Sequence, residues 1–149
     1  MIFKAANYNR TSLLKILEKL TPKELCFIPK GFSNNIIWNL VHILVTEQLL
    51  TYKLSGLPLN IDENFVRLFG KGSLPLISIS QEDINEVKEK LITANKQTKI
   101  DYDKGLFKNF SPYETSTGIV LNSVDDALQF NAFHEGIHLG IILSIKKLL

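Results

Sequence analysis

Two histidines four residues apart are the feature of this sequence that most directly indicates chemistry. His134 and His138 are two of only three histidines among the 149 residues. On an α-helix, side chains four positions apart lie on one face, so both imidazoles would point the same way. Neutral imidazole nitrogens are common ligands of divalent metals. The pair therefore predicts part of a metal site, provided that a further ligand lies opposite it.

Both segments that carry histidines have an apolar helical face, and the histidines lie on it. The face around the pair consists of Phe130, His134, Ile137, His138, Ile141, Ile145 and Leu148. The face around the third histidine consists of Trp38, Val41, His42, Val45, Leu49 and Tyr52. Apolar faces turn inward in a folded domain. The three imidazoles are therefore expected to converge in the interior if the two helices are neighbours.

Buried imidazoles have two explanations. A lone one is most often a core residue whose nitrogens hydrogen-bond to neighbours. Three together would cost several kcal/mol if left unpaired, whereas one divalent ion binds three nitrogens at once. Three neutral ligands also leave a coordination position open, where a catalytic ion lowers the pKa of a water or thiol. We therefore expect one divalent ion, for which zinc, nickel and iron are all suitable, at His42, His134 and His138.

Three further polar residues are candidates for orienting the imidazoles. They lie three or four positions from a histidine and are Thr46, Asn131 and Glu135. Hydrogen bonds from such neighbours fix the ring orientation of metal-binding histidines. Glu135 is equally compatible with the edge of the face, where it would point to solvent.

The string from His134 to His138, HEGIH, also matches the H-E-x-x-H signature of zinc proteases. Two observations oppose that interpretation. The segment after His138, LGIILSIKKLL, contains no His, Asp or Glu as the downstream third ligand. No clear strand is present to hold an extended peptide. A protease is therefore disfavoured.

The elements that must position these residues are helices. Apolar residues recur at helical spacing in four segments, about 5–20, 34–55, 81–100 and 124–146. Ser33 or Asn34, Ser80 and Ser123 are expected to cap the last three, and Thr21-Pro22-Lys23-Glu24 predicts a short extra helix by its capping box. A further helical turn is expected around 63–68. Because the connections 56–80 and 101–122 are too long for simple hairpins, we predict an all-α four-helix bundle with long crossover connections.

Composition indicates one domain. The chain is 45% hydrophobic and 21% charged, which is ordinary globular usage and excludes a disordered or fibrous protein. A net charge of +2 without a run of like charges disfavours nucleic-acid binding. No segment has the apolar length of a membrane span or the core of a signal peptide. With a single cysteine, Cys26, residues 1–149 are expected to form one cytoplasmic domain.

Two segments resemble a known family, and the resemblance extends over nearly the whole chain. They are GFSNNIIWNLVHILVTEQLLTYKLSGLPL and FNAFHEGIHLGIILSIKKLL, and they resemble the DinB-like family of metalloenzymes. The resemblance implies a four-helix bundle of unusual helix order. It also implies a divalent metal bound by one histidine of the second helix and an H-x-x-x-H pair of the fourth, at the places of His42, His134 and His138. Some relatives transfer small electrophiles to thiols such as bacillithiol, mycothiol or glutathione, and others are isomerases or hydrolases.

The open three-histidine site and the resemblance together favour one activity. An enzyme that activates a thiol or water for attack on a small electrophile, like a thiol S-transferase, is the first interpretation. The alternatives are a metal-dependent hydrolase and a noncatalytic metal-binding or stress-associated module. The resemblance and the apolar second and fourth helices also predict a homodimer.

Several other residues are open to two interpretations. Trp38, Tyr52 and Phe130 are expected in the core, although aromatic residues beside a metal could line a substrate pocket. The stretch YETST at 113–117 is either a lid or a solvated loop, and Cys26 is expected to be a buried or incidental thiol. Four basic residues would favour an acidic thiol if they gathered at the mouth of the site, and these are Lys4, Arg67, Lys71 and Lys104.

Overall fold

The computed structural model describes residues 2–149, and the protein is mainly helical. Its elements are α1 (Ile2–Lys19), α2 (Pro22–Cys26), α3 (Ile36–Gln48), the π-helical turn η1 (Leu49–Lys53), α4 (Glu63–Phe69), α5 (Gln81–Asp103), β1 (Tyr113–Glu114), β2 (Val120–Leu121) and α6 (Val124–Lys146). Among these helices, none is both long and apolar enough to cross a membrane. The mainly helical fold that the sequence predicts is therefore confirmed, with two short strands in addition.

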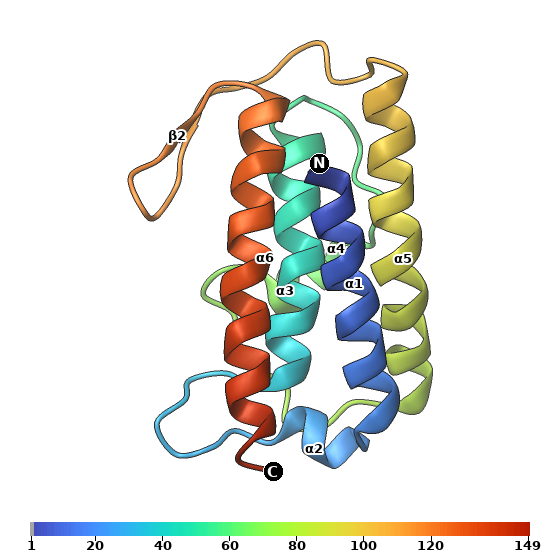
Figure 1. Ribbon diagram of the computed structural model, residues 1–149, viewed down its shortest axis with the longest axis vertical. Helices are drawn as coiled ribbons and strands as arrows, with labels where there is room; N and C mark the ends of the chain where they lie inside the picture. Colours follow the sequence, from blue (N-terminus) through green and yellow to red (C-terminus); the bar gives the residue numbers. More distant parts are fainter. Residues whose placement is uncertain (1) are drawn as a thin grey trace.

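The four longer helices, α1, α3, α5 and α6, run side by side (Figure 1). Helix α3 packs against α6, and α1 packs against both α5 and α6. Helices α3 and α5 run in one direction and α1 and α6 in the other, so the connection 54–80, which contains α4, returns the chain from one end of the molecule to the other (Figure 1). The connection 104–123 stays at one end and carries a short antiparallel hairpin, in which Tyr113 pairs with Leu121.

Side-chain caps define where the helices begin. Thr21 and Ser80 form capping boxes with Glu24 and Asp83, as the sequence predicts. Ser123 accepts a hydrogen bond from the backbone N–H of Asp126 at the start of α6. Such caps satisfy backbone donors that have no partner within the first turn of a helix. The predicted starts of these three helices are therefore confirmed.

The cap of α3 is Asn35, whereas the sequence predicts Ser33 or Asn34. The Asn35 side-chain oxygen accepts from the backbone N–H of Trp38 at 3.0 Å. Its amide nitrogen donates to the carbonyls of Cys26 and Leu76 at 3.1 and 2.7 Å. Asn35 is fully buried, so it satisfies three backbone groups from three segments at once. Neither Ser33 nor Asn34 makes a cap hydrogen bond to α3 in the described structure.

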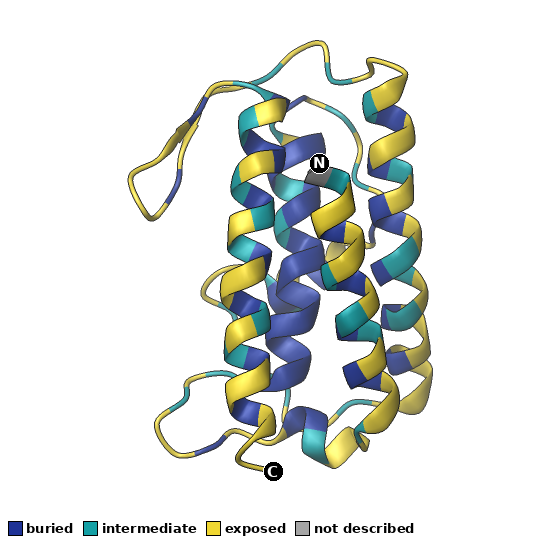
Figure 2. Ribbon diagram, viewed as in Figure 1, coloured by how far each residue is buried: buried dark blue, intermediate teal, exposed yellow. Residues whose placement is uncertain are grey.

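Helix α3 lies between α6 and α1, and its ribbon is mostly dark blue, the colour of buried residues, in Figure 2. Every residue of α3 except Thr46 is buried. The surrounding core includes Leu13 and Leu17 of α1, Leu91 of α5 and Ile142 of α6. A helix that is apolar all round is typical of such a central position.

The inward face of α6 differs from the predicted one. Ile137 and Leu148 were expected inside but are 43% and 54% exposed. The buried residues of α6 are Val124, Ala127, Leu128, Asn131, Glu135, His138, Ile142 and Ile145. Because apolar residues occur around most of this helix, their periodicity does not define one face. Glu135 turns inward and accepts a hydrogen bond from Arg10, and Asn131 turns inward and donates to Glu135.

A buried polar cluster connects all four long helices. Arg10 of α1 donates to Glu47 of α3 at 2.6 Å and to Glu135 of α6 at 2.7 Å. Thr98 of α5 donates to the other oxygen of Glu47 at 2.6 Å, and Asn131 donates to Glu135 at 3.0 Å. Burial lowers the pKa of Arg10, but the two carboxylates outweigh it and raise that pKa overall. The cluster therefore fixes how the four helices are rotated relative to one another.

Candidate metal centre

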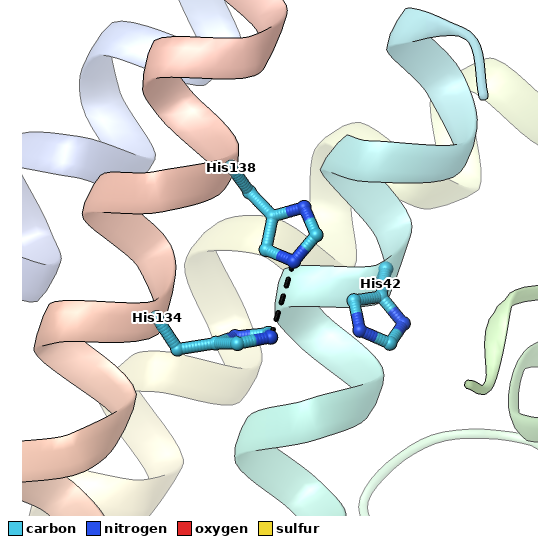
Figure 3. A group of neighbouring side chains, drawn as sticks. All are labelled: His42, His134 and His138. Carbon is cyan, nitrogen blue, oxygen red and sulfur yellow. Dashed lines mark hydrogen bonds between the residues drawn. The ribbon is translucent and has the colours of Figure 1, made fainter. Parts of the chain in front are cut away.

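The structure brings the three histidines together, as their spacing predicts. His42 comes from α3, and His134 and His138 come from α6, which packs against α3 (Figure 3). One ligand nitrogen from each ring lies within 4.8 Å of the other two. The Nε2 atoms of His134 and His138 are 3.1 Å apart. The three rings therefore form a compact nitrogen cluster between two helices.

His42 is held by the chain on one ring face and at both ring nitrogens. Its Nδ1 lies 2.7 Å from the carbonyl oxygen of Phe69, the last residue of α4. Because a carbonyl oxygen only accepts, Nδ1 carries the proton and Nε2 is unprotonated, so that it can accept from the Thr46 hydroxyl or bind an ion. The indole of Trp38 stacks on the ring with centroids 4.5 Å apart, and Thr46 Oγ1 lies 3.3 Å from Nε2.

His138 is fixed in the same tautomer by a side chain. Its Nδ1 lies 2.8 Å from Oδ1 of Asn39 on α3. The amide nitrogen of Asn39 donates to the carbonyl of Asn35 at 2.7 Å, which identifies Oδ1 as the atom that faces the imidazole. Since Oδ1 only accepts, Nδ1 of His138 donates and its Nε2 is unprotonated. Asn39 thus acts on His138 as the Phe69 carbonyl acts on His42.

His134 is the least constrained of the three rings. Its Nδ1 is buried and has no hydrogen-bond partner among the described residues. The ring of Phe130 stacks on it with centroids 6.1 Å apart. Because Nε2 of His138 is unprotonated, Nε2 of His134 carries the proton and donates to it in the absence of an ion. His134 is therefore the ligand most free to adjust to an ion.

Burial keeps all three imidazoles neutral at physiological pH. It lowers the pKa of His42, although the hydrogen bond to the Phe69 carbonyl opposes this. Burial and the nearby His42 lower the pKa of His134 to about 4. Burial and both other histidines lower the pKa of His138 to about 3. Neutral imidazole is the form that binds a metal ion.

The donor set fits a divalent ion on three grounds. The rings are neutral, two of them expose an Nε2 lone pair to the cluster, and the other nitrogen of each of those two is hydrogen-bonded to an oxygen. An outer acceptor on Nδ1 is the usual arrangement for metal-binding histidine. Two nitrogens that each lie about 2.1 Å from a tetrahedral ion are about 3.4 Å apart. The observed 3.1 Å between His134 and His138 is close to that value.

Of the three residues predicted to orient the rings, only Thr46 contacts an imidazole. Asn131 and Glu135 hydrogen-bond to each other and, through Glu135, to Arg10. Glu135 is fully buried, so the solvent-facing alternative is wrong. The acceptors at Asn39 and Phe69 were not among the residues predicted from the sequence. Asn39 could have been found as a polar residue in the apolar segment one turn before His42, whereas the main-chain carbonyl of Phe69 gives no sequence signal.

A cavity of about 270 Å³ opens beside the cluster. It is lined by His42, Thr46, Leu49, Leu50, Lys53, Leu54, Lys71, Tyr113, Thr115, Ser116, Phe130 and His134. Three residues of the stretch 113–117 thus face the cavity, and so does Phe130. Trp38 and Tyr52 are buried in the core, as expected. Cys26 is also buried, and burial raises the pKa of its thiol.

The basic residues at this cavity are only partly those considered from the sequence. Lys71 lines it, whereas Arg67 lines a separate groove between α4 and α5. Lys4 and Lys104 do not line the cavity. Lys53 lines it and was missed. Its signal is helical spacing, because it follows His42 by eleven positions on the face that also carries Thr46 and Leu49.

A helical fold with three neutral imidazoles that could hold an ion, beside an open cavity, defines a helical protein with a candidate metal centre. Comparison with protein-family models matches residues 5–142 to the DinB superfamily. The chain therefore belongs to the DinB superfamily, and the resemblance stated from its sequence is confirmed. A comparison with curated proteins found no match.

Replacement of Asn39 by leucine is expected to weaken metal binding about 10- to 100-fold, because His138 loses the acceptor that fixes its tautomer. Asn39→Asp retains an acceptor oxygen and should bind within a few-fold of the wild type. Competition with a chromophoric chelator measures both affinities. Equal affinity of wild type and Asn39→Leu would show that this hydrogen bond does not support the site.

The metal-free protein is expected to lose stability as the pH falls from 6.5 towards 4. Burial depresses the folded-state pKa of His134 and His138, so the unfolded chain takes up protons first and is favoured at lower pH. The loss for His138 alone is about 2 kcal/mol between pH 7 and pH 5. Denaturant unfolding at several pH values measures it. The variant His134→Gln, His138→Gln should show a flatter pH dependence, and an unchanged slope would contradict the assignment.

Proposed function

We propose that this protein is a divalent-metal-dependent enzyme that activates a thiol or a water for attack on a small electrophile, most specifically in the manner of a thiol S-transferase. DinB superfamily membership and the three-histidine cluster support the metal. The observation that carries the catalytic interpretation is the cavity, because His42 and His134 form part of its wall. A purely structural or sensory ion needs no such opening.

Within this proposal, His42, His134 and His138 would hold the ion, which when bound would lower the pKa of a thiol or water. The thiol proton leaves to solvent. The sulfur then forms a bond to the electrophilic atom, and the leaving group departs with its electron pair. The apolar side chains Leu49 and Phe130 exclude water from the electrophile.

The chain supplies positioning rather than proton transfer in this reaction. No Asp or Glu is among the described residues that line the cavity. The buried carboxylates Glu47 and Glu135 are both bound to Arg10. A mechanism that relies on a glutamate next to His134 as a general base, as in H-E-x-x-H proteases, therefore has no support in the geometry.

We also propose a bundle type for the fold and a cellular location for the protein. The four long helices would constitute a four-helix bundle of DinB-like type, with the 54–80 connection as its crossover (Figure 1). A cytoplasmic location is supported by the single cysteine, which has no partner for an internal disulfide.

The activity is tested with metal-loaded protein in two steps. Thermal shifts with glutathione, bacillithiol and mycothiol identify a thiol that stabilises the wild type more than it stabilises His42→Ala. Conjugation of that thiol with chlorodinitrobenzene is then followed by release of chloride and formation of the thioether. We expect the wild type to exceed both the uncatalysed rate and the His42→Ala variant.

The same preparation distinguishes the hydrolase. If no thiol stabilises the wild type selectively and no conjugation exceeds the uncatalysed rate, the transferase proposal fails. Hydrolysis of p-nitrophenyl acetate by metal-loaded wild type, and not by His42→Ala, would then identify water as the nucleophile. Inactivity in both assays would favour the noncatalytic metal-binding module.

We further propose a homodimer, in which α6 contributes part of the interface. Phe133, Ile137 and Leu143 are apolar residues of α6 that are 54%, 43% and 44% exposed. Light scattering is expected to give twice the chain mass of 16.9 kDa. Phe133→Asp should shift the mass towards the monomer, whereas Leu74→Asp, on an exposed loop, should not. A wild-type monomer across micromolar concentrations would overturn the proposal.

A further inference from the structure

The charged side chains that line the cavity beside the histidines are all basic. Lys53, at the end of η1, and Lys71, in the connection that follows α4, both line it. They come from two separate segments, so their presence at one cavity is a product of the fold and not of a local run of basic residues. No acidic residue is among the described residues of its lining. The cavity therefore has a positive mouth that no lining carboxylate neutralises.

The remaining lining divides into an apolar wall and a small polar group. Leu49, Leu50, Leu54 and Phe130 supply the apolar surface. Tyr113, Thr115 and Ser116, from the hairpin connection, supply hydroxyl groups. A wall of this kind suits an aliphatic or aromatic segment, and the hydroxyls suit an acceptor group at its end.

The π-helical turn carries three of the residues that line the cavity. Residues Leu49–Lys53 form η1 directly after α3, and three of them, Leu49, Leu50 and Lys53, line the cavity. The wider π turn changes the angular spacing of side chains relative to an α-helix, and such turns occur frequently at functional sites. The same turn keeps Tyr52 in the core, where its hydroxyl donates to Asp101 at 2.5 Å. The irregular turn thus turns two leucines and a lysine towards the cavity and a tyrosine away from it.

From this arrangement we infer that the substrate taken up beside the histidines is a small organic anion, whose apolar body lies on the leucines and Phe130 and whose carboxylate is bound by Lys53 and Lys71. The inference rests on the proposed function in that the reacting end of the molecule faces the histidines. A cationic substrate would be repelled by two lysines, and a neutral one would gain nothing from them. With about 270 Å³ available, the molecule is of metabolite size.

The test uses two probes that differ only in the anion. They are 6-mercaptohexanoate and 6-mercaptohexanol, which share the thiol and the chain length. Calorimetry measures the affinity of each for the zinc-loaded protein. We expect the carboxylate to bind about 25-fold more tightly, since each of the two lysines contributes about fivefold in a solvent-exposed site. Raising the ionic strength should reduce that ratio.

Substitutions test whether the two lysines cause the difference in affinity between the two probes. Lys53→Gln and Lys71→Gln should each lower it about fivefold, and the double variant should bind both probes equally. Lys146→Gln removes the same charge about 18 Å further along α6 from His134 and should leave the ratio unchanged. Equal binding of the two probes by wild type, a preference that persists in the double variant, or no measurable binding of either probe would overturn the inference.

The same measurement separates this inference from the proposed function. If the carboxylate preference is present but neither probe binds more tightly with zinc than without it, the anion-binding cavity stands and thiol activation by the metal fails. If both probes bind tightly only with zinc and show no preference, thiol activation stands and the anionic substrate is wrong.

Discussion

Replacement of His134 by alanine is expected to abolish stoichiometric binding of a divalent ion. Wild-type protein purified without chelator or nickel resin should contain about one ion per chain. His134 supplies one of three nitrogens that lie within 4.8 Å of one another, and the chain has no further histidine to replace it. The loss in affinity should exceed the 10- to 100-fold that follows from losing an outer hydrogen-bond partner. Elemental analysis by mass spectrometry measures the ion directly.

A control and a second readout make this test specific. Cys26→Ser removes the one thiol of the chain, which lies outside the cluster, and should retain the ion. An ion at a hundredfold excess over its dissociation constant stabilises the native state by about 2.7 kcal/mol. Thermal unfolding should therefore show a metal-dependent shift in wild type and Cys26→Ser, and none in His134→Ala. Full occupancy in the variant that lacks all three histidines would refute the metal site.

Replacement of Arg10 by methionine is expected to cost about 3 to 5 kcal/mol of stability. The guanidinium is fully buried and is the cation that faces both Glu47 and Glu135. Its removal leaves two carboxylates in the interior without a counter-charge, and a buried unpaired charge is far more costly than a missing surface ion pair. Equilibrium unfolding in urea gives the change in the free energy of unfolding.

Three further variants identify the cause. Arg67→Met, on the surface, should change stability by less than about 0.5 kcal/mol. Arg10→Lys keeps the charge but cannot reach both carboxylates with a planar fork, so an intermediate loss is expected. Adding Glu47→Gln and Glu135→Gln to Arg10→Met should recover part of the lost stability. A loss below about 1 kcal/mol in Arg10→Met would mean that the cluster is not a stabilising contact.

The parts of the fold that could be predicted from the sequence are those with local causes. Capping residues such as Ser80 and Ser123 mark helix starts by hydrogen bonds to residues three positions away, so their effect is visible in a short window. The rotation of α6 could not be predicted in this way. It depends on Arg10, which lies 125 positions from Glu135 and reads in sequence as the solvent side of an amphipathic helix.

The residues of the candidate site also differ in whether a local pattern in the sequence predicts their position. His134 and His138 share a helix turn, and their spacing alone places their rings together. His42 required the further assumption that two apolar helices are neighbours, which the packing of α3 on α6 satisfies. The cavity depends on two long connections, and neither Lys71 nor Tyr113 has a periodic pattern that aims it at the histidines. Loops fold by contacts with the rest of the molecule, so their side chains are the hardest to place from sequence.

The carbonyl of Phe69 that holds His42 limits how far the site can be recognised in a sequence or transferred to another protein. A main-chain oxygen cannot be removed by substitution, so no position in the sequence records this partner as a residue type. The sequence instead constrains the backbone conformation of the segment that follows α4. Gly70 belongs to that segment, and an added Cβ at this position would lie 2.5 Å from the carbonyl oxygen of Val66. A transplant of the three histidines onto another helical scaffold would copy the ligands and leave behind the loop that orients one of them.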